Sequence, residues 1–208
     1  MGVLKTLTDE YFGEDIRKED LIDISGVEIV SFTDNNGKFH KYGYRVKEGD
    51  FIEMSKTLAK LIYAIIEKRG TECDLNDIDV SNIKSMNFIF ENSHFNGDVS
   101  GWDVSNVEYM SYMFRGAKKF NQPLNNWDVS KVKDMDYMFF CAKSFNQPLD
   151  NWDVSSVRDM ICMFGDAESF NQPLDNWIVK WSCDIKNMFS YTQLENNNKL
   201  PKWYLDRQ

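Results

Sequence analysis

Residues 120–130 read F-N-Q-P-L-N-N-W-D-V-S, and residues 145–155 repeat them with one change as F-N-Q-P-L-D-N-W-D-V-S. A degenerate earlier copy of the last part begins at Ile78. The period is 25 residues, marked by tryptophan at the same place in successive copies: Trp102, Trp127, Trp152 and Trp177. Self-similarity at a fixed period is the signature of a repeat architecture, in which neighbouring copies share one core.

Two periodicities within each copy predict a strand followed by a helix. Leu124, Trp127 and Val129 have the L-x-x-L-x-L spacing of a leucine-rich-repeat strand. Apolar residues then recur at three- and four-residue steps, which is typical of an amphipathic helix: Val132, Met135, Met138, Phe139 and Ala142. The predicted fold class is α/β, a right-handed leucine-rich-repeat-like solenoid with parallel strands on the concave side and about five turns over residues 77–192.

The columns of identical residues predict the core of this stack. Besides the four tryptophans, the expected core residues are Met113, Met138, Met163, Phe114, Phe139 and Phe164. Methionine columns can also form soft binding surfaces, but their helical spacing beside phenylalanine favours the core. A fourth column is expected to form an asparagine ladder that satisfies buried backbone groups between turns: Asn96, Asn121, Asn146 and Asn171.

The flanking segments look like caps for the two open ends of the stack. Residues 1–48 form an N-terminal segment with a predicted β-hairpin, because residues 27–32 and 39–46 flank the turn signal Asn35-Asn36-Gly37. Residues 49–76 contain a predicted capping helix that ends at Gly70. Its apolar face is Phe51, Met54, Leu58, Leu61, Ile62 and Ile65. Residues 193–208 are expected to form the C-terminal cap.

Composition excludes several function classes. The formal charge of −9 argues against nucleic-acid binding, which needs a basic stripe, and is compatible with a basic protein partner. No apolar run predicts membrane insertion or a signal peptide, so the chain as written is expected to be cytoplasmic, and to be surface-exposed or secreted if its precursor carries a leader. His40, His94 and the four cysteines show no metal-binding spacing. No cofactor, metal or catalytic residue is predicted.

The phrases W-D-V-S-x-V-x-x-M-x-x-M-F and F-N-Q-P-L-x-N-W resemble those of the BspA-like leucine-rich-repeat family, over about residues 50–190. The resemblance implies a binding and adhesion module without catalytic activity, often exported and common among bacterial surface proteins.

A polar column on the outward side of the predicted strands is the candidate binding site. Its members are Asp79, Asp103, Asp128 and Asp153. Asn126 and Asn151 lie two residues before Asp128 and Asp153, and Asn176 has the equivalent place in the next copy. Stacked carboxylates repel one another unless something compensates, so one interpretation is a concave face that binds a basic partner or a cation. The other is structural: each aspartate accepts hydrogen bonds at the corner that follows the strand.

The sequence therefore predicts a non-enzymatic protein-binding repeat module that recognises a macromolecular partner through its surface. It would act as a surface adhesion and host-interaction protein or as an intracellular inhibitor or effector. The alternative is a structural or assembly protein that self-associates through the ends of the stack.

Overall fold

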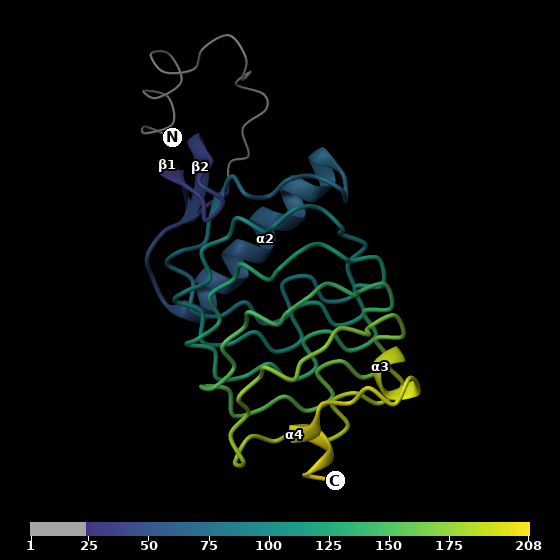
Figure 1. Ribbon diagram of the computed structural model, residues 1–208. Coiled ribbons are helices and arrows are strands. Elements are labelled where there is room, and N and C mark those ends of the chain that lie inside the picture. Colours follow the sequence, from purple (N-terminus) through teal and green to yellow (C-terminus); the bar gives the residue numbers. More distant parts are fainter. Residues whose placement is uncertain (1–23) are drawn as a thin grey trace, which may run out of the picture.

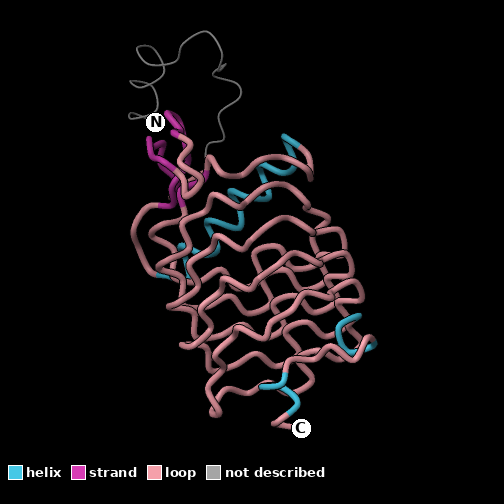
Figure 2. The backbone as a smooth tube through the Cα atoms, in the orientation of Figure 1, coloured by secondary structure: helices cyan, strands magenta, loops and turns pink. Residues whose placement is uncertain are grey.

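The structure is a computed structural model that describes residues 24–208; the part of the predicted N-terminal segment before residue 24 lies outside the described residues. Its helices and strands cluster at the two ends of the molecule, and a tall stack of loops and turns lies between them (Figures 1 and 2). The elements are β1 (Val27–Thr33), β2 (Phe39–Val46), α2 (Phe51–Arg69), β3 (Ile78–Asp79), α3 (Gln193–Asn196) and α4 (Lys202–Leu205).

The predicted leucine-rich-repeat-like solenoid of alternating strands and helices is wrong. Among the described residues, the only sheet is a small mixed one with the order β1-β2-β3, in which β1 and β2 are antiparallel and β2 and β3 are parallel. Residues 80–192 contain isolated β-bridges and turns but neither a helix nor a longer strand. The region predicted to alternate strand and helix is instead a series of turns, and we call it the repeat stack.

The W-D-V-S phrase forms no strand because its backbone turns at nearly every step. The amide of Trp127 donates to the carbonyl of Leu124 at 3.1 Å, and the amide of Val132 donates to Val129 at 2.9 Å. Between these turns, Oδ1 of Asp128 accepts the amide of Ser130 at 3.0 Å. Local side-chain to backbone bonds of this kind compete with strand pairing.

The segment predicted as a helix is a pair of consecutive turns. Tyr137 and Cys141 have φ values of 53° and 57°, in the left-handed region, which a right-handed helix cannot accommodate. The amide of Tyr137 does not bond within its own segment but donates to Ile161 of the next copy at 2.9 Å. Such turns still direct every third or fourth side chain inward, and this explains why the spacing imitates a helix.

These segments form five parallel layers joined by backbone hydrogen bonds, and we call them rungs: residues 85–92, 109–116, 134–141, 159–166 and 184–191. Single parallel bridges join the first residues of neighbouring rungs, as in Ser85 with Tyr109 and Asp134 with Asp159.

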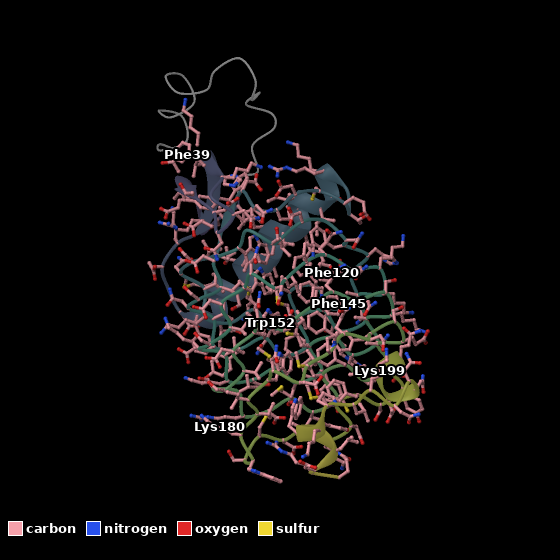
Figure 3. The ribbon with its side chains drawn as sticks, viewed as in Figure 1. Phe39, Phe120, Phe145, Trp152, Lys180 and Lys199 are labelled. Carbon is pink, nitrogen blue, oxygen red and sulfur yellow. The ribbon has the colours of Figure 1, made fainter. Side chains whose placement is uncertain are left out.

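The residues predicted as core all lie in it. The methionine and phenylalanine positions named above are fully buried, and the four tryptophans are at most 3% exposed. Aromatic rings of one copy stack on those of the next, as Phe120 does on Phe145 with centroids 6.1 Å apart (Figure 3). Each tryptophan also donates its indole N–H to a carbonyl of the preceding copy, as Trp152 does to Leu124 at 2.9 Å. A buried indole needs such a partner.

The asparagine ladder is present in the return segments. Oδ1 of Asn121 accepts the amide of Asn146 at 2.9 Å, and Oδ1 of Asn146 accepts the amide of Asn171 at 2.9 Å. Gln147 adds a second bond, from its Nε2 to the carbonyl of Asn121 at 3.1 Å. Each asparagine thus joins two copies where backbone-to-backbone bonding is sparse.

The N-terminal end of the stack is closed by the hairpin and by α2, which lies across it in Figure 1. The hairpin joins the stack because Tyr44 of β2 pairs with Ile78 of β3. Asp50 caps α2 by accepting the amides of Ile52 and Glu53, and Gly70 follows its last turn with φ of 89°. The buried face of α2 is the predicted one except for Phe51, which is exposed.

At the C-terminal end, α3 and α4 cover the last copy. Trp203 in α4 stacks on Trp177 with centroids 6.4 Å apart and donates its indole N–H to the carbonyl of Leu174 at 2.9 Å. It therefore continues the tryptophan column by one further member, in a segment whose surrounding sequence no longer shows the repeat.

Candidate functional site

The predicted aspartate column serves the backbone of its own repeats. Oδ1 of Asp103 accepts the amide of Ser105 at 3.1 Å, and Oδ1 of Asp153 accepts that of Ser155 at 2.9 Å. The hydrogen bonds from Ser155 also lower the pKa of Asp153. Oδ1 of Asp79 accepts the amide of Ser81 at 3.0 Å in the same way, and Asp79 is in addition buried and paired with Arg45 of the hairpin. These contacts agree with the structural interpretation of the column.

The asparagines predicted beside that column are exposed at Asn126, Asn151 and Asn176. Their side chains make no hydrogen bond within residues 24–208. They offer an exposed polar surface away from the rungs' aromatic residues in sequence, and we use them below as a control surface.

A different set of outward side chains forms the candidate binding surface. On one side of the rungs, three aromatic rings stack in consecutive copies, and we call them the aromatic ladder: Phe88, Tyr112 and Tyr137. Their centroids are 4.9 and 5.0 Å apart, close to the spacing of adjacent strands. Phe88 is 49% exposed and the tyrosines are half-buried, so this stack lies outside the core.

The backbone of the ladder is unusual for aromatic residues. Phe88, Tyr112 and Tyr137 have φ values of 64°, 61° and 53°. A bulky residue at positive φ is disfavoured, and asparagine tolerates this region better. The fifth rung does have an asparagine at the equivalent place, Asn187, and the fourth has Cys162. Backbone preference therefore does not account for aromatic rings at three of the five positions.

A cationic side chain of the protein itself, Arg115, already lies against the aromatic ladder. The guanidinium of Arg115 lies 5.6 Å from the ring centroid of Tyr112 and 5.9 Å from that of Phe140. Its Nη1 donates to Glu91 at 2.6 Å. This arrangement shows that a positively charged group can lie against these rings.

Carboxylates lie beside the ladder on the third and fourth rungs. Asp136 directly precedes Tyr137, and its Oδ1 accepts the amide of Ile161 at 2.8 Å. Burial, together with the hydrogen bond and the charge of nearby Asp159, raises the pKa of Asp136 to about 8. Asp134 adds to the same effect. A carboxyl group held protonated near neutral pH by burial and by its acidic neighbours would be stabilised in its charged form by an incoming cation.

The sequence predicted none of this surface, because its members do not share a residue type. The column reads Phe88, Tyr112, Tyr137, Cys162 and Asn187, while the columns chosen from the sequence were the invariant ones. In a repeat protein the invariant positions build the core and the variable outward ones are free to bind. The signal in the sequence that could have indicated this surface is the pair of tyrosines one repeat apart, Tyr112 and Tyr137.

Other polar clusters in the described region serve the fold. Nε2 of His40 lies 2.7 Å from Oδ2 of Asp34 in a buried pair. Burial acts to raise the pKa of Asp34, but bonds with His40 and the amides of Lys38 and Asn36 bring it below its usual value. This pair closes the hairpin turn. Within residues 24–208, no group of three histidine, cysteine or acidic side chains is arranged to hold a metal ion, and no helix could span a membrane.

The fold and this surface define a class: a repeat protein built from stacked turns, with an invariant aromatic core and a variable outward face. A family described as "Mycoplasma protein of unknown function, DUF285" matches residues 59–160 and 125–203, and the chain belongs to that family. Comparison with curated proteins finds no match, and comparison with solved structures finds none either.

Proposed function

We propose that this chain is a non-enzymatic protein-binding module whose binding surface is the aromatic ladder with the carboxylates beside it. The observation that carries the proposal is the stack of Phe88, Tyr112 and Tyr137 outside the core, in backbone positions that disfavour such residues. Tyrosine and other aromatic residues are enriched among the residues that contribute most to binding at protein interfaces.

The chemistry of the surface favours a partner with lysine or arginine side chains. Ring faces attract cations, as Arg115 illustrates over Tyr112. Asp134 and Asp159 add negative charge on the neighbouring rungs, beside the protonated carboxyl group of Asp136. The net charge of −9 would also accelerate association with a basic protein.

The resemblance to BspA-like proteins supports one version of this proposal, in which the module mediates adhesion or host interaction. An intracellular inhibitor or effector is the other version. Both require a protein partner at the same surface, and they differ in where that partner is found.

Affinity capture with two matched variants tests the proposal. The first variant is Phe88→Asn with Tyr112→Asn and Tyr137→Asn, which keeps a residue suited to positive φ at each position. The control is Asn126→Ser with Asn151→Ser and Asn176→Ser, three changes on exposed residues elsewhere. Both are checked for native thermal unfolding before a lysate of the source organism is applied.

We expect the ladder variant to recover at least about tenfold less of the captured protein, which corresponds to about 1.4 kcal/mol. The control should recover it as the unmodified chain does. Equal recovery by the two variants would contradict the proposed surface.

A further inference from the structure

Within the rungs, the alternate backbone amides donate to the next rung, and bonds in the opposite direction occur only where a rung begins, as from Asp184 to Arg158 at 3.0 Å. In the fourth rung, the amides of alternate residues donate to carbonyls of the fifth rung at 2.8 to 2.9 Å: Met160 to Asp184, Cys162 to Lys186, Phe164 to Met188 and Asp166 to Ser190. The stack therefore presents donors at its C-terminal edge, where no further rung follows. The equivalent amides of the fifth rung belong to Ile185, Asn187, Phe189 and Tyr191.

The C-terminal cap provides hydrogen-bond acceptors for only the last two of these four amides. The amide of Tyr191 donates to Oε2 of Glu195 at 2.8 Å, and that of Phe189 faces the hydroxyl oxygen of Tyr204. The amides of Ile185 and Asn187 have no acceptor within residues 24–208. These two amides, two residues apart, are therefore unpaired, whereas the equivalent amides of the other four rungs all donate to the next rung.

These two residues line a surface groove of about 510 Å³. Trp181 forms part of the wall and is 76% exposed. The guanidinium of Arg207 lies 4.9 Å from the ring centroid of Trp181, and its Nη2 donates to the carbonyl of Val179. The Nη1 atom of Arg207 is buried and has no hydrogen-bond partner among the described residues.

The charges in the groove favour an anionic ligand. Lys186 and Arg207 line it together with one carboxylate, Asp184. Oδ1 of Asp184 is already occupied by the amide of Lys186 at 3.0 Å. The side chains that line the groove thus carry a net charge of +1, on a chain whose net charge is −9.

We propose that this groove binds an extended acidic segment of a partner protein, which adds to the open edge as one more layer. Two of its carbonyls, two residues apart, accept the amides of Ile185 and Asn187, as Asp184 and Lys186 do for the preceding rung. A carboxylate of the segment accepts from Arg207, and an apolar side chain packs on Trp181. This site is distinct from the aromatic ladder and does not depend on the function proposed for it.

A second copy of the chain does not fit this edge in the same register. The matching carbonyls would have to come from the first rung, but Oγ of Ser55 in α2 already donates to the carbonyl of Ser85 at 2.6 Å. Because α2 lies across the N-terminal end of the stack, the carbonyls there are covered, whereas the amides of Ile185 and Asn187 at the C-terminal end are not.

Selection from a library of random twelve-residue peptides on the immobilised full chain tests the proposal. The most enriched peptide is synthesised and its dissociation constant is measured for the unmodified chain, Trp181→Ala, Arg207→Gln and Ile178→Ala. Ile178 is the matched control, because it is 77% exposed near the same end but does not line the groove. Amide hydrogen exchange of Ile185 and Asn187 is followed by NMR with and without the peptide.

The expected peptide carries a fixed aspartate or glutamate and binds at least about tenfold more weakly to Trp181→Ala and Arg207→Gln, with Ile178→Ala unchanged. Exchange at Ile185 and Asn187 should slow when it binds. The proposal is overturned if no peptide is enriched, if the enriched peptide binds Trp181→Ala equally well, or if exchange at both amides is unaffected. Concentration-dependent dimers that Trp181→Ala abolishes would overturn it in favour of self-association.

Discussion

A single aspartate in each W-D-V-S phrase shows how one side chain redirects the chain. The alternation of Trp127, Asp128 and Val129 fits a strand, and the two apolar side chains are indeed buried. The carboxylate of Asp128, however, binds the amide of Ser130 and turns the backbone at that point. The residue predicted as a binding group is therefore one that determines the local fold.

Removing these carboxylates should destabilise the protein. Asp103→Ala with Asp128→Ala and Asp153→Ala is expected to lower the free energy of unfolding by about 1.5–3 kcal/mol, at roughly 0.5–1 kcal/mol for each lost cap. Urea denaturation measures the change. The same triple with asparagine retains Oδ1 as an acceptor and should lose less. A triple alanine variant as stable as the unmodified chain would show that these hydrogen bonds do not determine the turns.

The tryptophan column should be much more sensitive. Trp127→Ala removes a ring that is 2% exposed and stacks on Trp102, together with the bond from its indole to Val99. A loss of about 3–5 kcal/mol is expected for a large-to-small change in the core. Denaturation monitored by far-ultraviolet circular dichroism measures it, with Trp181→Ala as the exposed control. Similar losses from both substitutions would contradict the assigned core.

At the scale of the element, burial was easier to predict from sequence than conformation. The hairpin and α2 were predicted near their observed bounds because each carries local signals: a turn at Asn35-Asn36-Gly37 for the hairpin, and for α2 an apolar face that ends at Gly70. In the rungs, inward side chains at three- and four-residue steps suit both a helix and paired turns. Positive φ separates the two. Asn92, Gly116 and Asp166 are residue types suited to positive φ, but Tyr137 and Cys141 are not, so the signal is not repeated from copy to copy.

The acidic cluster on the rungs should make stability depend on pH. Because the pKa of Asp136 is raised to about 8 from an ordinary value near 3.8, the folded state holds a proton that the unfolded state releases. This contribution is fully present below about pH 4 and is lost as the pH rises through about 8.

Asp136→Asn imitates the protonated carboxyl and can keep the bond to the amide of Ile161. It should leave stability nearly unchanged at pH 4 and raise it by about 1 kcal/mol at pH 9, after allowance for solvent screening. Urea denaturation at the two pH values measures this. The prediction fails if the variant is equally destabilised at both.

At the scale of the whole molecule, the two ends of the stack differ in chemistry. The N-terminal end presents carbonyls and is closed by α2, while the C-terminal end presents amides and is closed only in part by α3 and α4. Between them, invariant columns supply the shared core and variable outward columns supply the surface. The repeat and its core columns could be predicted from the sequence; the binding face could not, since it depends on which variable side chains the rungs bring into contact.

Site-specific photo-crosslinking tests the central claim, that the aromatic ladder is the surface that binds a protein partner, most directly. A photoreactive phenylalanine is placed at position 112 in one chain and at position 126 in another, replacing Tyr112 or the exposed Asn126. Each is irradiated in a lysate of the source organism. We expect a covalent adduct with one protein from position 112 and little from position 126. Adducts of equal yield from both positions, or from position 126 alone, would contradict the claim.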